Sequence, residues 1–176
     1  MDSISLKYTD TTDKANGIAG MAITLIACQG EHLLAEIRFD EPDGHNMHMA
    51  HDFGLPGNPR MSAKSLWSQS VKDLRAMASM VLGNIECRKA ITAGFEPGFN
   101  AERIVRDLVR SEGQKMCSLD KDEADTLFDS CHHYVRRLFA HPDLLDVARR
   151  FSAHISDRRI LTKNETVEFL AALGLR

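Results

Sequence analysis

The strongest pattern of apolar and polar positions in the chain lies between Ser62 and Ile85. Apolar side chains recur there at alternating steps of four and three residues: Trp67, Val71, Leu74, Ala78, Val81 and Ile85. This spacing predicts the apolar face of a long amphipathic helix. A helix of about 24 residues is about 36 Å long, which is the span of a small domain. We therefore expect the other elements to be built around this helix.

The rest of the chain after this helix also has helical periodicity. A helix is expected over 100–112, with Gly113 as its end. Two apolar stripes then follow on either side of Pro142, a residue that favours the first position of a helix. Thr162 and Glu165 have the spacing of a capping box and predict the start of a last helix.

The first 55 residues are expected to combine helix and strand. An apolar stretch predicts a helix over 14–29 with Asp13 as its N-cap. Gly30 is a suitable end for this helix because glycine adopts left-handed backbone conformations without a Cβ penalty. The alternative is one helix over 14–38 that continues through Gly30, since an interior glycine costs only about 1 kcal/mol.

Two alternating stretches, 33–39 and 47–53, predict an antiparallel β-hairpin. Residues 41–44, with the sequence Glu-Pro-Asp-Gly, separate them and have the composition of a tight turn. Matching the apolar faces of the two strands places Phe39 opposite Met47.

These elements define the expected fold class, which is α+β and predominantly α. We expect a single domain over 1–176 with six helices. Residues 1–55 would form a mixed α/β part with a small N-terminal antiparallel β element, and residues 62–176 a helical bundle around the long central helix.

Composition narrows the class of protein without indicating an activity. Hydrophobic residues make up 43% of the chain, charged residues make up 27%, and the net charge is −3, as in ordinary soluble proteins. This charge gives no global attraction to nucleic acid or to an anionic membrane. The N-terminus lacks the pattern of a secretory signal, and the longest apolar run, 18–28, is too short to cross a bilayer. We therefore expect a cytoplasmic protein with reduced, structural cysteines.

The sharpest candidate for chemistry is a cluster of possible metal ligands: His45, His48, His51 and Asp52. Imidazole and carboxylate groups together with the neighbouring methionines could hold zinc or copper. In a strand, however, His45 and His51 would lie on one face and His48 on the other. The side chains would converge only if the segment were a loop, and solvated histidines on a polar hairpin are the alternative.

A second candidate lies on the helix expected before Pro142. Asp129 precedes His132 and His133 by three and four residues, which would let the carboxylate orient an imidazole as a general base. Both histidines flank the apolar stripe of this helix, where solvated polar side chains are expected.

Two further groups complete the candidates. A local excess of basic residues could bind an anion or nucleic acid, although helix-dipole effects account for much of it: Arg136, Arg137, Arg149, Arg150, Arg158 and Arg159. Phe95 and Phe99, in a connector between helices, either pack on the bundle or mark a partner site.

No nucleophile, base and metal set stands out, so the leading hypothesis is a non-enzymatic cytoplasmic interaction module. It would act through a helical face or the hairpin edge as a homodimer, without a cofactor. The first alternative is a metal-dependent enzyme or metal-binding protein, with zinc or copper held by the 45–52 cluster and His32 or a bundle histidine completing the shell. The second is nucleic-acid binding through the basic residues of 136–163.

Overall fold

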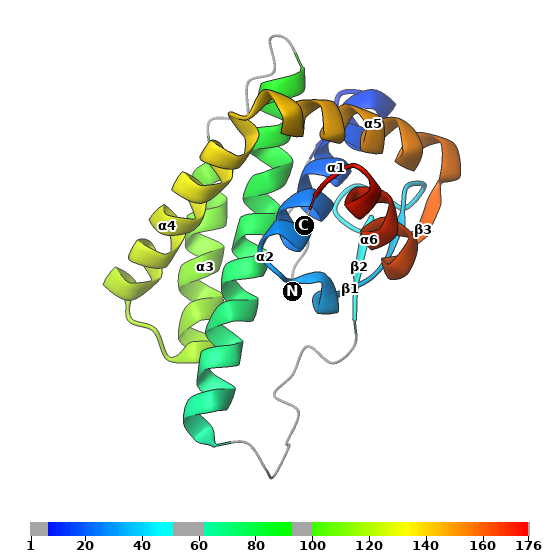
Figure 1. Ribbon diagram of the computed structural model, residues 1–176. Helices are drawn as coiled ribbons and strands as arrows, with labels where there is room; N and C mark the ends of the chain where they lie inside the picture. Colours follow the sequence, from blue (N-terminus) through cyan, green and yellow to red (C-terminus); the bar gives the residue numbers. More distant parts are fainter. Residues whose placement is uncertain (1–6, 51–61, 93–99, 176) are drawn as a thin grey trace.

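The structure is a computed structural model and describes residues 7–50, 62–92 and 100–175 (Figure 1). Within these ranges it has six α-helices and a three-stranded antiparallel sheet, so the predominantly helical character, the small sheet and the number of helices are confirmed. The elements in chain order are α1 (Thr11–Ala27), β1 (Leu34–Arg38), β2 (Met47–Met49), α2 (Ala63–Ile91), α3 (Ala101–Cys117), α4 (Lys121–Phe139), α5 (Pro142–Arg158), β3 (Ile160–Thr162) and α6 (Lys163–Ala172).

Helix starts follow side-chain capping closely. Ser62 caps α2, and the capping box of Thr162 and Glu165 at α6 is confirmed. The N-cap of α1 is Asp10 instead of Asp13, because the Asp10 side chain accepts the hydrogen bond from the Asp13 backbone N–H. Satisfying free N–H groups in the first turn is what fixes each of these boundaries.

The helix ends were predicted in part. The first helix ends shortly before Gly30, as predicted, and the alternative helix over 14–38 is wrong, because Gln29 adopts a left-handed backbone conformation and the Gly30 N–H donates to the Leu25 carbonyl at 2.8 Å, closing α1. Gly113 does not end α3. The helix continues to Cys117, where Ser118 takes the left-handed conformation instead.

The sheet has the order β2-β1-β3, and its register differs from the prediction. Ile37, not Phe39, is the partner of Met47. The reason is Asn46, whose side-chain amide donates to backbone carbonyls of the loop at 2.9–3.1 Å and so holds a longer loop than a tight turn. A shift of two residues keeps the same side chains on the buried face, and Ile37 and Met47 are both buried.

The third strand, β3, was not predicted. It is three residues long and pairs antiparallel with β1, so it places the C-terminal part of the chain beside the hairpin (Figure 1). Such a short segment has too little periodicity to indicate a strand, and its pairing with β1 decides its conformation.

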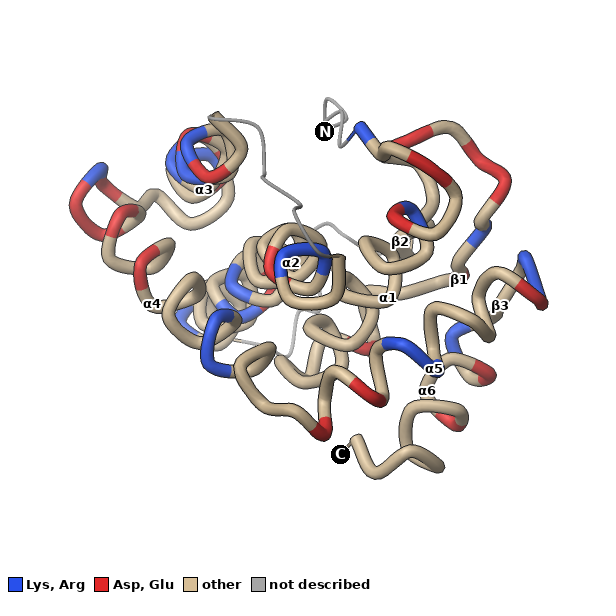
Figure 2. Tube along the Cα trace, turned by 90° about the horizontal axis from the view of Figure 1, so that it is seen from above, with Lys and Arg blue, Asp and Glu red and all other residues tan. Residues whose placement is uncertain are grey.

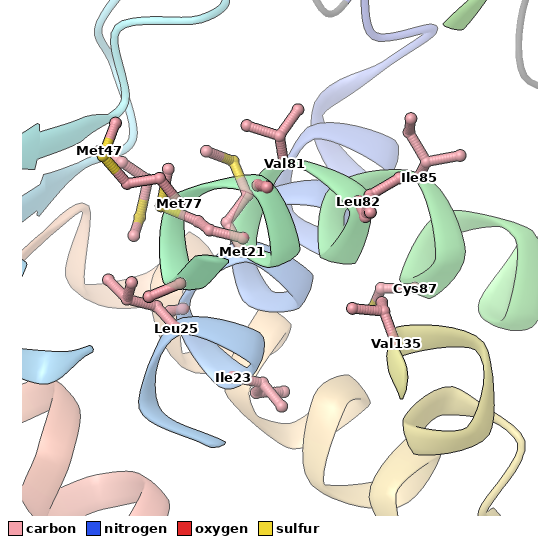
Figure 3. Close-up of a cluster of buried hydrophobic side chains, with 14 of the residues drawn as sticks. Met21, Ile23, Leu25, Met47, Met77, Val81, Leu82, Ile85, Cys87 and Val135 are labelled. Carbon is pink, nitrogen blue, oxygen red and sulfur yellow. The ribbon is translucent and has the colours of Figure 1, made fainter. Parts of the chain in front are cut away.

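Helices α1 and α2 approach each other to backbone contact. A Cβ atom added at Gly20 would lie 2.3 Å from the Gly83 carbonyl oxygen, and one added at Gly83 would lie 2.2 Å from Thr24 Oγ1. No side chain fits between the helices at this crossing. Apolar side chains surround it, and Figure 3 shows Met21 and Leu25 of α1 gathered with Met77, Val81 and Leu82 of α2.

The apolar stripe of α2 is buried from Leu74 to Ile85, as predicted. Its first member is an exception, since the Trp67 side chain is 51% exposed. The Trp67 indole N–H instead donates to the Cys117 carbonyl at 2.8 Å, so this ring links the start of α2 to the end of α3.

An ion pair between α1 and α2 is buried beside the glycine crossing. The Arg88 guanidinium donates to both carboxylate oxygens of Asp13, at 2.6 and 2.5 Å. Burial raises the pKa of Asp13, but the hydrogen bonds from Arg88 and from the Thr9 N–H outweigh it, so the pKa lies below its ordinary value. Both side chains are almost completely enclosed, so each depends on the other for its stability.

An extra methyl group in a packed core costs about 1–3 kcal/mol. We expect Gly20→Ala to destabilise the protein by more than this, because its methyl group would clash with the backbone of Gly83. Gly113→Ala is the matched control, since its nearest neighbour would be the tip of Leu119 at 3.3 Å and alanine favours a helix. Thermal unfolding should show a lower Tm for the first variant only. Equal Tm values for the two variants would contradict the close approach of α1 and α2 at Gly20.

We expect Asp13→Asn to lower the free energy of unfolding by about 3–5 kcal/mol at pH 7, because it removes the negative charge that neutralises a buried guanidinium. Because the pKa of Asp13 is lowered in the folded state, its contribution is complete above the unfolded value and is lost as pH falls through the folded value. The difference in the free energy of unfolding between the native protein and Asp13→Asn, measured by urea unfolding, should therefore shrink below about pH 4. Asp43→Asn, which removes a more exposed partner of Lys14, should cost about 1 kcal/mol or less.

Candidate metal centre

Three helices bring two carboxylates and one imidazole together. Glu86 belongs to α2, Glu102 to the first turn of α3 and His132 to α4, and one donor atom of each lies within 4.8 Å of the other two. Helices α2, α3 and α4 run side by side in Figure 1 and pack against one another. Among the residues that the structure describes, this is the one group with the composition and spacing of a metal site.

The distances are close to those of a coordination sphere. His132 Nε2 lies 3.5 Å from Glu86 Oε1 and 3.7 Å from Glu102 Oε1. Ligands about 2.1 Å from one metal ion are about 3.0–3.4 Å apart in octahedral or tetrahedral geometry. The two nitrogen–oxygen distances are therefore longer than in a coordination sphere by only about 0.1–0.7 Å.

A lysine on α2 already contacts both carboxylates. Lys89 Nζ donates to Glu86 Oε1 at 2.8 Å and to Glu102 Oε1 at 2.9 Å. The ammonium thus bridges the same two oxygens that would bind a cation. With two carboxylates facing one ammonium, the cluster keeps an excess negative charge when His132 is neutral.

The two glutamates differ in their surroundings. The Glu86 side chain is 10% exposed and that of Glu102 is 45% exposed, so the cluster is closed on the α2 side and open to solvent at α3. Burial raises the pKa of Glu86, but His132 and Lys89 together lower it more, and the net pKa is below the ordinary value. Burial lowers the pKa of Lys89 while both glutamates raise it, with a net increase. Glu86 is therefore ionised at neutral pH and acts as an acceptor only.

His132 carries an unsatisfied polar atom. Its Nε2 is buried and has no hydrogen-bond partner, although it points at the two carboxylates. The His132 imidazole packs on the Phe128 ring, with the ring centres 5.7 Å apart. The Arg106 guanidinium covers the Phe128 ring at 4.2 Å from its centre. Buried nitrogen atoms of this kind almost always have a partner. A bound cation would supply one for Nε2.

The predicted ligand cluster lies elsewhere. His45 is exposed, and His48 is half-buried on β2 with its Nε2 lacking a hydrogen-bond partner. His51 and Asp52 lie outside the described residues, as do Phe95 and Phe99, so the structure does not test those predictions.

The second group predicted from the sequence, Asp129 with His132 and His133, does not form, because Asp129 pairs with an arginine. Asp129 accepts a hydrogen bond from Arg106 at 2.7 Å instead of orienting an imidazole, and the adjacent His133 is exposed. His132 is the member of this group that reaches a site, through carboxylates on other helices.

The six arginines of the basic group in 136–163 are all exposed, but several have carboxylate partners. Arg150 pairs with Asp146, Arg158 pairs with Glu165, and Arg159 pairs with Asp40 while its guanidinium covers Phe39. Acidic and basic segments alternate over these helices in Figure 2. The local positive charge is thus smaller than the sequence indicated.

Sequence reasoning missed Glu86, Lys89 and Glu102. One signal was available, because Glu86 lies in a largely apolar stretch of α2, 76–88, that is buried on every side, and a charge in such a stretch needs a partner. The identity of that partner depends on how α3 and α4 pack, which spacing within one helix does not report.

Comparisons of the chain with family models, with curated proteins and with solved structures give no match. In the described ranges, none of the helices is long and apolar enough to cross a membrane. The functional argument therefore rests on the chemistry of the site.

We expect the pKa of Glu86, followed by NMR of its side-chain carboxyl carbon, to lie below its ordinary value in the native protein. Lys89→Met should raise this pKa, because the variant removes a hydrogen bond and a positive charge from the carboxylate. Lys115→Met is the control, since Lys115 pairs with Glu112 on an exposed part of α3. An unchanged Glu86 titration in Lys89→Met would contradict the described cluster.

Proposed function

We propose that this protein binds one divalent first-row metal ion through Glu86, Glu102 and His132. The observation that carries the proposal is the convergence of these three donors, from three helices, to within 4.8 Å. The buried and unpartnered Nε2 of His132 supports it independently. The proposal keeps the metal-binding alternative formulated from the sequence, with one bundle histidine as a ligand, and moves the site away from residues 45–52.

The donor set favours particular ions. Carboxylate oxygens suit manganese and magnesium, whereas imidazole suits zinc and iron, so a mixed set of two carboxylates and one imidazole fits Mn²⁺, Fe²⁺ or Zn²⁺. Cu⁺ fits less well, because it prefers sulfur ligands and this group consists of two carboxylates and one imidazole. Three protein ligands also leave coordination positions for water or a substrate, which is typical of catalytic metal sites.

In this proposal α2 is the central support of a helical bundle, with Glu86 held on it while α3 and α4 bring the other two ligands. Ligands on facing helices are the usual way in which bundles hold metals. The interaction module and homodimer expected from the sequence stay predictions, since a surface with a defined partner does not emerge from the described residues. Metal binding is compatible with either a catalytic or a structural role for the ion.

We expect titration calorimetry with MnCl₂, on untagged protein purified without metal-affinity resin, to show one site per chain. His132→Ala should weaken binding by about tenfold or more, because it removes the nitrogen ligand. Mn²⁺ is the probe of choice because histidines near residue 48 attract it less than they attract zinc or copper.

Two matched variants make the experiment specific. His133→Ala changes the adjacent exposed imidazole on α4, and His48→Ala changes the segment first considered from the sequence; both should bind Mn²⁺ as the native protein does. Loss of binding in His48→Ala with retention in His132→Ala would return the site to residues 45–52. No binding by the native protein at millimolar Mn²⁺ would overturn the proposal.

A further inference from the structure

A side chain of the protein itself, Lys89, occupies the position between the carboxylates where a metal ion would bind. Lys89 lies three residues after Glu86 on α2, so its ammonium reaches the carboxylates from the same helix that holds the buried ligand. It donates to the same Oε1 atoms that lie nearest His132. A metal ion and the Lys89 ammonium therefore compete for the same two carboxylate oxygens.

We propose that Lys89 is a built-in competitor that occupies the site in the absence of metal and limits its affinity, an inference that rests on the metal-binding function proposed above. A tethered ammonium is always at high local concentration, so an incoming ion must break two charge-assisted hydrogen bonds before it binds. The ammonium also holds Glu86 and Glu102 near each other, so the ligands are positioned before the ion arrives.

This arrangement differs from a structural ion pair in its charge balance. The described groups that contact Lys89 are Glu86 on its own helix and Glu102 on α3, and His132 on α4 lies next to both carboxylates. A single positive charge neutralises only one of the two carboxylates, and the ammonium makes no hydrogen bond to His132 Nε2. A divalent ion would neutralise both carboxylates and bind the imidazole as well. Exchange of the ammonium for the ion is therefore favoured by charge and by ligand chemistry.

The side chain has room to leave. Lys89 is 28% exposed and lies beside Glu102, on the open edge of the cluster, so its flexible stem can carry the ammonium into water without unpacking the core. Arg88, the preceding residue, is by contrast enclosed with Asp13 and cannot exchange in this way.

The test compares Mn²⁺ affinity, by titration calorimetry, in the native protein, Lys89→Met, Lys89→Arg and Lys115→Met. We expect Lys89→Met to bind at least about tenfold more tightly, since the ion no longer displaces two charge-assisted hydrogen bonds. Lys89→Arg keeps a competing cation and should stay near the native affinity, as should Lys115→Met. The double variant Lys89→Met/His132→Ala should lose the gain, which ties it to this site.

Each outcome has a defined meaning. Equal or weaker binding by folded Lys89→Met, with binding by the native protein intact, overturns the competition and leaves the metal site standing. Binding by Lys89→Met at micromolar Mn²⁺, with binding by the native protein only at higher concentrations, supports the competition. Absence of binding in all four proteins overturns the metal site and the competition with it. Thermal unfolding of each variant without metal confirms that the comparison is made on folded protein.

Discussion

The backbone contact between α1 and α2 at Gly20 and Gly83 determines which way the other side chains of α2 face. It fixes one side of α2 against α1. Successive residues of a helix differ by about 100°, so side chains two residues apart point to nearly opposite sides. Arg88 therefore faces Asp13 of α1, while Glu86 faces α3 and α4, where Glu102 and His132 meet it. A side chain at the crossing would separate the helices and disturb both arrangements.

The two charged clusters beside this crossing solve different physical problems. Asp13 and Arg88 are matched one to one, both carboxylate oxygens are hydrogen-bonded, and the pair is sealed from water. Such a pair stabilises the interface only as long as both partners remain. The cluster of Glu86 has two carboxylates for one ammonium, an imidazole nitrogen without a partner and an edge open to solvent. Incomplete charge balance together with access distinguishes a site that can accept a ligand from one that only holds helices together.

Most of the helices could be predicted because their boundaries and buried faces depend on residues close in sequence. The hairpin register, the third strand and the cluster depend on contacts between distant residues and could not. The capping box at Thr162 and the buried stripe ending at Ile85 follow from interactions within a few residues, and both are confirmed. The hairpin register failed because one side chain, Asn46, satisfies the loop carbonyls and lengthens the loop, which no face-matching argument includes. Strand β3 exists because β1 offers it an edge. The cluster of Glu86, Glu102 and His132 could not be predicted for the same reason, since its groups come from three helices and only His132 had been considered.

Comparison of the 45–52 segment with the helical cluster shows that spacing along the sequence does not report which donor groups lie together in space. Neighbouring histidines in one segment attract attention because they are close in sequence, yet a strand separates alternate side chains. Helices that pack together hold donors rigidly, and here Glu86 and His132 are largely enclosed while Glu102 is exposed in the first turn of α3. The cluster thus combines two largely enclosed donor groups with an exposed carboxylate that can adjust its position, an arrangement that would suit exchange between an internal ammonium and an external ion.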